Sequence, residues 1–405
     1  MTPESSSPRI CRLATDVSQG VPDAVERFWE ELATGGTPLV EPTSDHPKER
    51  RVTFAWRYAE GTEAVHLVSA LTPSPVPLTR LEGTDLGGVT YRARADLRLP
   101  YTFLVDLPGH LLHETDWSTW HPYRTTDPLN RRTFTTPSRE STHQPTVESV
   151  VELDRAPAQP WVQPRSGGPR GRFEELQVES PTIGTKRAWL WHPPVARPPT
   201  GLVVLLDGWT WATAMGMNTI LDNLVADQAI PALAVVLVEE GLAEERLREY
   251  GLNADFVRFL SEDVVPSARR RSGAPDDADR TIAAGQSLGG LTAAYAALLR
   301  SDVFGNVLSQ SGSFWWPHGT PHDVGAEQLT RDYARTPRLP VRFHLEVGLH
   351  EGGFMLSANR HLRDVLVARE YDVDHVELNG GHSWLTWRGS FADALVSLTG
   401  RWPRR

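Results

Sequence analysis

The stretch "RTIAAGQSLGGLTAAYAALL", Arg280–Leu299, decides the fold of this chain. It opens with a short apolar run, passes through Gly285-Gln286-Ser287-Leu288-Gly289, and continues as an Ala- and Leu-rich segment. This order predicts a strand, a sharp turn and a helix, with a serine held on the turn. Two interpretations are open at this point. The serine is either a catalytic nucleophile or an incidental residue in a Gly-rich connection.

The chain around this stretch alternates between two kinds of segment. From Phe173 onward, Val- and Leu-rich runs such as 200–208 and 231–240 alternate with amphipathic segments such as 217–228. Continuous apolar strands separated by helices are typical of a mostly parallel sheet covered on both faces. Together with the Gly-x-Ser-x-Gly turn, this predicts an α/β-hydrolase domain over residues 170–405.

The N-terminal part of the chain has a different rhythm. Residues 1–20 are expected to be a disordered leader, and residues 21–36 have the apolar spacing of a helix. Residues 51–106 contain short β-like runs with turn residues about every ten positions, which predicts a small antiparallel sandwich. The Pro- and Thr-rich run 108–169 is interpreted as a crossing segment and linker. We therefore predict an N-terminal β-sandwich domain with its linker over residues 21–165.

Composition limits the classes of function. The 405 residues carry a net charge of -10, which argues against general binding to nucleic acid or to an anionic membrane. No run is long and apolar enough to cross a membrane, and we find no signal peptide. The one cysteine, Cys11, excludes a disulfide framework and a Cys-based metal site. A reduced, cytoplasmic setting is the simplest prediction.

Ser287 has the partners that a nucleophilic serine requires, in the expected chain order. A serine needs a base, and the base is oriented by an acid; in α/β-hydrolases the order is Ser, acid, His. Glu351 in "LEVGLHEGGF" follows one predicted strand, and His382 in "LNGGHSW" follows the last. Glu346 in the same strand is an alternative acid, but we favour Glu351.

Two backbone N–H groups are candidates to stabilise the oxyanion. The first belongs to Leu288, directly after the serine at the start of the predicted helix. The second belongs to Trp209 in "VVLLDGWTWA", which ends an early strand. The alternative for this second segment is a plain Asp-Gly turn.

Aromatic and basic residues lie in three segments of the sequence that directly follow predicted strands. They lie in "DGWTWA", "SQSGSFWWPH" and "GGHSWLTWRG" and comprise Trp209, Trp211, Trp315, Trp316, His318, Trp384, Trp387 and Arg388. Some of these tryptophans must be core, and about half are expected to line a cleft. Flat aromatic walls with an arginine suit planar, anionic, polyphenolic ligands. Arg248 extends the rim of this cleft or forms an ion pair on a helix surface.

These segments resemble the ferric enterobactin (enterochelin) esterase family, hydrolases of catecholate siderophores. "DGWTWA", "REYGLNADF", "AAGQSLGG", "SQSGSFWWPH" and "GGHSWLTWRG" occur in the family's order, and "FAWRY" and "YTFLVD" are similar to its N-terminal domain. The resemblance covers most of the chain. It implies a cytosolic enzyme that opens the trilactone of a ferric catecholate siderophore and so releases the iron. It also implies Ser287 as nucleophile, His382 as base, and no cofactor, since iron enters only with the substrate.

Two other functions were weighed against this one. A β-sandwich ahead of the same hydrolase domain also occurs in hydroxycinnamoyl or carbohydrate esterases and acyltransferases. Such substrates are usually outside the cell, and the chain shows no signal peptide. A non-catalytic binding module is disfavoured by the intact pair of Ser287 and His382.

Overall fold

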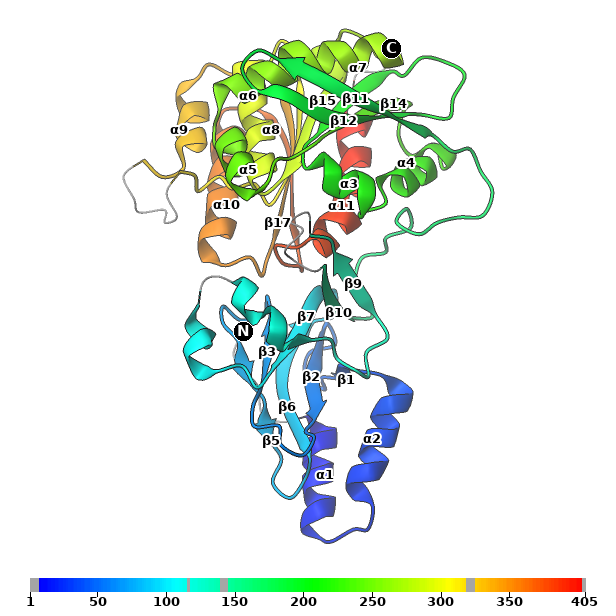
Figure 1. The fold of residues 1–405 in the computed structure, drawn as a ribbon, viewed down its shortest axis with the longest axis vertical. Coiled ribbons are helices and arrows are strands. Elements are labelled where there is room, and N and C mark those ends of the chain that lie inside the picture. The colour runs from blue at the N-terminus through cyan, green and yellow to red at the C-terminus, as the bar shows by residue number, and fades with distance from the viewer. Residues whose placement is uncertain (1–6, 115–116, 139–144, 318–324, 403–405) are drawn as a thin grey trace. The chain divides into compact units, whose positions relative to one another are not determined.

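The computed structural model describes residues 7–114, 117–138, 145–317 and 325–402, which divide into two compact units. The N-terminal unit comprises Met1–Ala158 together with Asn379–Leu385. The C-terminal unit comprises Gln159–Leu378 and Thr386–Arg405. Figure 1 labels the helices and strands of both. The loop Asn379–Leu385 thus belongs with one unit, although its two ends join residues of the other.

The described part of the N-terminal unit begins with two helices. The first corrects our prediction of a disordered leader over residues 8–18, while residues 1–6 of that predicted leader lie outside the described residues. Helix α1 (Pro8–Ser18) starts at Ser7, whose hydroxyl accepts hydrogen bonds from two backbone N–H groups of the first turn. Leu13 of α1 is buried in one cluster with residues of α2 (Ala24–Gly35). The Ser-Pro pair that suggested disorder is instead an N-cap followed by a proline at the first helical position. The helix predicted over 21–36 is confirmed by α2.

Two antiparallel sheets follow, as the sequence predicted. The first has the strand order β1 (Leu39–Pro42), β2 (Glu49–Arg57), β6 (Leu86–Arg94), β5 (Thr79–Arg80). The second has the order β4 (Val76–Pro77), β3 (Val65–Ser69), β7 (Arg98–Val105), β10 (Thr146–Glu152), β9 (Thr133–Thr136), with β8 (Arg124–Thr125) paired to β7. Phe54 of one sheet meets Tyr101 of the other with ring centroids 4.7 Å apart. This shared core makes the unit a sandwich.

The region interpreted as a linker contributes to this sandwich, so that prediction is wrong for much of its length. It contains the short helices η1 (Gly109–His113) and η2 (Trp117–Tyr123) as well as β8, β9 and β10. Trp120 and Val151 are buried. The many prolines and threonines mark turns and edge strands rather than an unstructured connection.

The C-terminal unit is built on one eight-stranded sheet, which confirms the predicted mostly parallel α/β-hydrolase domain. Its order is β11 (Arg172–Ser180), β12 (Gly184–His192), β14 (Leu233–Val238), β13 (Gly201–Leu205), β15 (Thr281–Gln286), β16 (Asn306–Gln310), β17 (Arg342–Gly348), β18 (Asp372–Leu378). Strands β11 and β12 are antiparallel at one edge, and the strands from β14 to β18 are parallel.

Helices cover both faces of this sheet (Figure 1). On one face lie α3 (Gly208–Thr213), α4 (Met217–Ala226) and α11 (Trp384–Gly400); Trp211 of α3 packs on Phe391 of α11 at 4.9 Å. The other face carries α5 (Ala243–Tyr250), α6 (Ala254–Arg258), the π-helix η3 (Phe259–Val264), α7 (Val265–Ser272), α8 (Leu288–Leu299), α9 (Gln328–Arg335) and α10 (Gly353–Ala368). The short helix η4 (Ala278–Arg280) precedes β15.

Parallel strands bring the residues that follow them to one edge of the sheet. Asp207 follows β13, Ser287 follows β15, Ser311 follows β16 and Glu351 follows β17. The topology therefore collects polar residues from four separate parts of the sequence at the carboxyl end of the sheet.

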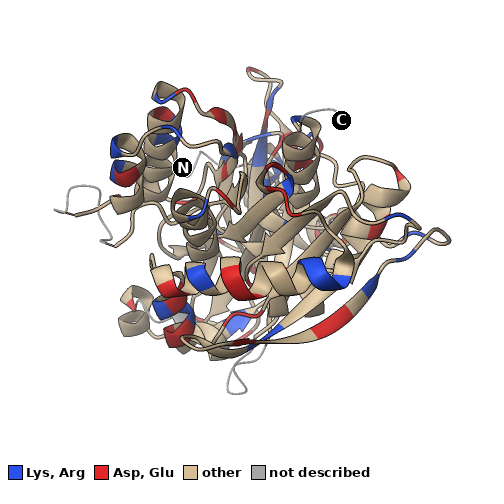
Figure 2. Ribbon diagram, turned by 90° about the horizontal axis from the view of Figure 1, so that it is seen from above, with Lys and Arg blue, Asp and Glu red and all other residues tan. Residues whose placement is uncertain are grey.

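Charged residues of both signs occur on the described helices and strands. Figure 2 shows acidic and basic residues interspersed along the helices and strands. None of the described helices combines the length and the apolar composition that crossing a membrane requires. Within the described ranges, no three His, Cys, Asp or Glu side chains are grouped so as to hold a metal ion.

The docking of α1 gives a first test. Replacing Leu13 with Ala removes a fully buried side chain, and we expect a loss of about 2–5 kcal/mol in the unfolding free energy of the N-terminal unit. The neighbouring exposed change Arg12→Ala serves as control and should stay within about 0.5 kcal/mol. Denaturant unfolding of both variants measures this. Equal stabilities would mean that α1 is not docked in solution.

Candidate active site

Ser287 lies on a strained turn between β15 and α8. Its backbone angles are φ 55° and ψ -120°, a region that residues with a Cβ rarely adopt. The turn is held in place because the Ser287 N–H donates to the carbonyl of Gln310 on the neighbouring strand (3.0 Å). Strain of this kind is maintained only where the surroundings over-determine it, and it concentrates at functional sites.

The glycines around Ser287 are required by space. A Cβ on Gly285 would lie 2.4 Å from the backbone carbon of Gly289. A Cβ on Gly290 would lie 2.5 Å from Oγ of Ser309. Helix α8 therefore approaches β15 and β16 more closely than it could if Gly285 or Gly290 carried a side chain. This close approach is what turns the chain sharply enough to present Ser287 at the edge of the sheet.

Two groups lie close to the Ser287 side chain. Its Oγ is 3.3 Å from Oγ of Ser313, and the Ser313 N–H donates to the Ser287 carbonyl (3.0 Å). Leu288 is the first residue of α8, so its N–H has no acceptor within the helix. This position suits the predicted donor to an oxyanion formed at Ser287.

Glu351 is held at the same edge by neighbouring groups. Its Oε1 accepts hydrogen bonds from Oγ of Ser311 (2.6 Å) and from the N–H of Gly348 (2.6 Å). Ser311 in turn accepts from the indole N–H of Trp387 (2.8 Å). These bonds fix one carboxylate oxygen of Glu351, and its role as the acid stays a prediction.

Glu346 belongs to a different network, which supports our preference for Glu351. It is 3% exposed and accepts hydrogen bonds from Gln310 (2.8 Å) and Ser390 (2.6 Å). Its Oε1 also lies 3.1 Å from Nε2 of His344. Burial raises the pKa of Glu346, but the bond to His344 and the other donors outweigh burial and keep that pKa below its ordinary value.

His344 completes this buried pair. Burial lowers the pKa of His344, but the hydrogen bond and charge of Glu346, with Asp374 on the other ring nitrogen, raise it above the ordinary value. Both carboxylate oxygens of Glu346 are thus bound by structural partners. Glu346 is thus part of a buried network, and the choice of Glu351 over Glu346 as the acid stays a prediction.

His382 is exposed and lies in the segment Asn379–Leu385, which comprises the loop after β18 and the first two residues of α11. The loop packs with the N-terminal unit. It is joined at Leu378 and Thr386 to the C-terminal unit, so His382 stands four residues from each junction. The role of His382 as base stays a prediction.

Trp209 does not supply the second oxyanion donor, and this part of the prediction is wrong. Its N–H donates to Oε2 of Glu240 (2.9 Å), and Thr210 donates to the other oxygen from its N–H and its hydroxyl (3.2 and 2.8 Å). Glu240 therefore caps helix α3 from the end of the neighbouring strand. The glutamate lies 31 residues away in sequence, so the segment itself gave no sign of it.

A buried ion pair beside the turn was not anticipated. Asp207 is 1% exposed and accepts two hydrogen bonds from Arg246 (2.6 and 2.9 Å). Its Oδ2 lies 3.1 Å from where a Cβ on Gly289 would stand, so the carboxylate rests against the first turn of α8. The sequence offered one sign of a polar site here, because Asp207 is the polar residue near the end of the apolar run 200–208.

The six tryptophans divide into core and surface. Trp211 and Trp387 are buried and donate to Gln286 and Ser311, so Trp387 is a packing residue and not a wall of a cleft. Trp209, Trp315, Trp316 and Trp384 are half-buried. Four of the six are thus partly exposed, and whether they line a cleft stays a prediction, but the prediction for Trp387 is wrong.

Trp315 and Trp316 belong to an aromatic cluster of the C-terminal unit. Their ring centroids are 5.9 Å apart, and Trp315 meets the exposed Phe354 edge-on at 5.9 Å. They follow Ser313, which contacts Ser287. This cluster offers flat apolar surface in the segment that follows Ser313, the contact of Ser287.

The predicted basic residues have separate positions. Arg388 is half-buried on α11, and Arg248 is exposed on α5. Next to Arg248, Glu249 is buried and pairs with Lys186 (2.7 Å), so these two neighbours do not form a surface ion pair with each other. His318 lies outside the described residues.

Comparison with known families divides the chain in the same way. The family described as "Putative esterase" matches residues 180–398. The family described as "Enterochelin esterase, N-terminal" matches residues 51–162. These two ranges correspond to the sheet of the C-terminal unit and the sandwich of the N-terminal unit.

Individual proteins resemble the chain over most of its length. The iron(III) enterobactin esterase of Escherichia coli K12 is 31% identical over 376 residues, which is 86% of this chain and 90% of that protein. A solved structure of ferric enterobactin esterase from Salmonella typhimurium superposes with a TM-score of 0.78 at 29% identity, covering 92% and 98% of the two chains. The enterobactin esterase from Shigella flexneri, in the presence of enterobactin, gives 0.73 at 28% identity, covering 89% and 96%.

The pair of His344 and Glu346 predicts a pH window for stability. The pKa of Glu346 is lower in the folded protein than its value of 4.5 in the unfolded chain. Ionised Glu346 therefore stabilises the fold above pH 4.5, and this contribution is lost as the pH falls through the pKa of the folded state. The pKa of His344 is higher in the folded protein than its value of 6.5 in the unfolded chain. Protonated His344 therefore stabilises the fold below pH 6.5, and this contribution is lost as the pH rises through the pKa of the folded state. We expect Glu346→Gln to cost about 3–5 kcal/mol within that window and less on either side.

Denaturant unfolding of Glu346→Gln at several pH values measures this window. Glu377→Gln is the matched control, because Glu377 pairs with Arg360 in a more exposed setting (2.6 and 2.7 Å). It should cost no more than about 1 kcal/mol. A pH-independent loss in Glu346→Gln would contradict an ionised pair.

Proposed function

The chain belongs to the enterobactin esterase family, and we propose that it hydrolyses the ester bonds of a ferric catecholate siderophore such as enterobactin. The proposal rests on one observation above all: Ser287 stands on a strained turn at the carboxyl edge of the sheet, where Glu351 is also held. The Ser, acid, His order of the chain supplies the remaining member, His382. Iron enters only as part of the substrate, and the protein needs no cofactor of its own.

The proposed reaction begins with attack by Ser287. Its Oγ adds to the carbonyl carbon of one lactone ester while His382 takes the hydroxyl proton. The carbonyl oxygen becomes an oxyanion, for which the N–H of Leu288 at the start of α8 is the donor at hand. The C–O bond of the ester then breaks, and His382 returns the proton to the departing alkoxide.

Water completes the hydrolysis. The siderophore is now open, with a free hydroxyl at one end and an ester to Ser287 at the other. His382 removes a proton from water, which attacks this ester carbonyl. The bond between the carbonyl carbon and Oγ of Ser287 then breaks, and His382 returns the proton to Oγ. The net change is one ester and one water converted to an alcohol and a carboxylic acid, and the weakened scaffold lets the iron be released.

Glu351 is proposed as the acid that orients His382. One of its oxygens is bound by Ser311 and Gly348. An acid in this role stabilises the imidazolium that forms during attack. Ser311 accepts a hydrogen bond from Trp387 and donates one to Glu351, so it helps to set the position of the Glu351 carboxylate.

Recognition of the substrate is proposed to combine aromatic contacts with a few basic groups. A ferric tris-catecholate complex is a multiple anion, while the chain carries -10, so long-range attraction is absent. Trp315, Trp316 and Trp384 offer half-buried aromatic surface. Arg388, His318 and Arg248 are proposed to contact the anionic complex, and Arg388 is the first candidate. We place the reaction in the cytoplasm, from the single cysteine and the sequence alone.

The nucleophile gives the direct test of this function. We expect Ser287→Ala to abolish hydrolysis of ferric enterobactin, by a factor on the order of 10⁶, while the fold and ligand binding persist. His382→Ala should be nearly as damaging, and Glu351→Gln should cost about 10² to 10⁴. Mass spectrometry of the products measures ester cleavage, and circular dichroism checks folding.

A panel of substrates separates the proposed function from its neighbours. Cleavage of a feruloyl sugar in preference to the ferric trilactone would favour a hydroxycinnamoyl esterase. More than a few per cent of activity in Ser287→Ala would remove Ser287 as nucleophile. A crippled Glu346→Gln enzyme of normal stability, with an active Glu351→Gln enzyme, would make our choice of acid wrong.

Arg388 tests the recognition of charge. We expect Arg388→Ala to raise KM for the ferric siderophore about tenfold, equivalent to about 1.4 kcal/mol, and to leave a small neutral ester almost unaffected. Arg401→Ala makes the same change of charge just after the end of α11, about 20 Å from Arg388 along the helix axis, where Arg401 pairs with Asp372, and should leave KM unchanged. Equal losses on charged and neutral substrates would mean that Arg388 supports the fold instead.

A further inference from the structure

The loop that carries His382 is anchored to the turn between β6 and β7 of the sandwich. The side-chain amide of Asn379 donates to Oδ1 of Asp96 (2.7 Å), although the two residues are 283 positions apart. The backbone carbonyl of Asn379 accepts from the N–H of Arg98 (3.2 Å). One residue of the loop is thus held by both its side chain and its backbone.

A second anchor follows two residues later. A Cβ on Gly381 would lie 2.8 Å from Cβ of Ala70 and 3.1 Å from Cδ2 of Leu99, so the loop backbone rests directly on the sandwich. Gly381 is buried, as is Asn379, whereas His382 is exposed. The last buried residue of this anchor is thus directly next to the histidine in the chain.

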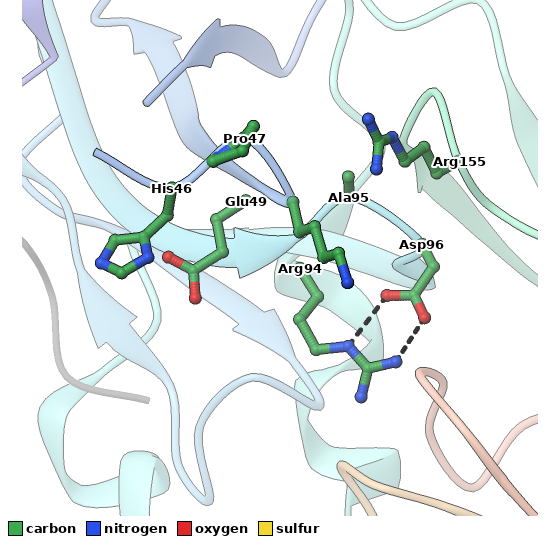
Figure 3. Close-up of a pocket in the computed structure, with 8 residues that line it drawn as sticks. His46, Pro47, Glu49, Arg94, Ala95, Asp96 and Arg155 are labelled. Carbon is green, nitrogen blue, oxygen red and sulfur yellow. Dashed lines mark hydrogen bonds and ion pairs between the residues drawn. The ribbon is translucent and has the colours of Figure 1, made fainter. Parts of the chain in front are cut away.

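Asp96 is itself held in a defined orientation. Figure 3 shows the ion pair in which Arg94 reaches across to Asp96, with bonds of 3.2 and 2.5 Å. Oδ1 accepts from both Arg94 and Asn379. Burial raises the pKa of Asp96, but the bonds from Arg94 and Asn379 outweigh it and keep the pKa below its usual value. Asp96 is therefore an ionised, fixed acceptor for the loop.

We propose that Asp96 is a positioning residue for His382, acting through its hydrogen bond to Asn379. This inference rests on the proposed function, in which His382 is the base. Asp96 touches no reacting atom in this role. It fixes the loop three residues before the histidine, and the sandwich thereby contributes to catalysis through the placement of the base.

The physical reason is the shortness of the loop. Asn379 is the first of five residues between β18 and α11, and each residue spans at most about 3.6 Å. A displacement of Asn379 is therefore passed on to His382 over only three residues. A misplacement of about 1 Å at a catalytic group can cost about 10²-fold in rate.

Kinetics of two variants at position 96 test this. Asp96→Ala removes the acceptor and should lower kcat for ferric enterobactin about ten- to hundredfold, with KM changed less than about twofold. Asp96→Asn keeps an oxygen that can accept from Asn379 and should retain most of kcat. The matched control is Asp154→Ala, which removes another aspartate of the N-terminal unit from an ion pair, with Arg50 (2.6 Å), and leaves kcat unchanged.

Reversing the pair gives a second test. Asn379→Asp faces Asp96 with a second carboxylate and should lower kcat more than Asp96→Ala does. The double variant Asp96→Asn with Asn379→Asp restores one amide-to-carboxylate bond in the opposite direction. We expect it to recover at least about tenfold over Asn379→Asp alone. Additive losses in the double variant would overturn the proposal.

The background of His382→Ala separates positioning from general damage. With imidazole supplied to that variant, adding Asp96→Ala should cause no further loss, because the residue that Asp96 positions is gone. A further loss there, or an Asp96→Ala enzyme that matches Asp154→Ala, would refute the role of Asp96. Full activity of Ser287→Ala or His382→Ala would instead refute the proposed function, so the two failures are distinct.

Discussion

The close approach of helix α8 to β15 and β16 is the constraint on which the rest of this structure depends. It excludes any side chain at Gly285 and Gly290 and forces Ser287 into a conformation that residues with a Cβ rarely adopt. The strain is sustained because β16 supplies the acceptor at Gln310 and the sheet fixes both flanking elements. A reactive serine is thereby held at a fixed point of the sheet edge, and the neighbouring strands supply its surroundings.

The acidic residues at this edge differ in function because they differ in partners. Asp207 is paired with Arg246, Glu240 caps α3, and Glu346 is paired with His344 deep in the unit. Each satisfies a buried charge or a helix end, which is what buried carboxylates need for stability. Glu351 is held by Ser311 and a backbone N–H through one oxygen. The same residue type thus serves structure in three positions and, as we propose, catalysis in one.

The sandwich domain gains a role from the loop that it holds. Asn379 and Gly381 are fixed by residues of the N-terminal unit, while the loop connects strand β18 to helix α11 of the other unit. A domain that touches no reacting atom can then govern the position of a base. This offers a physical reason for a siderophore esterase to keep a sandwich ahead of its hydrolase domain.

The sequence by itself determined what depends on neighbours along the chain. The Gly-x-Ser-x-Gly turn, the alternation of apolar strands with helices, and the order of Ser287, Glu351 and His382 are local patterns, and the predicted α/β-hydrolase fold and sandwich were confirmed from them. What tertiary structure decided involves partners far apart in sequence. Glu240 accepts a hydrogen bond from the Trp209 N–H, and the burial of Trp387 depends on how α11 packs. Periodicity shows which face of an element is apolar, but not which distant group meets each polar atom, and hydrogen bonds are specified only once the chain has packed.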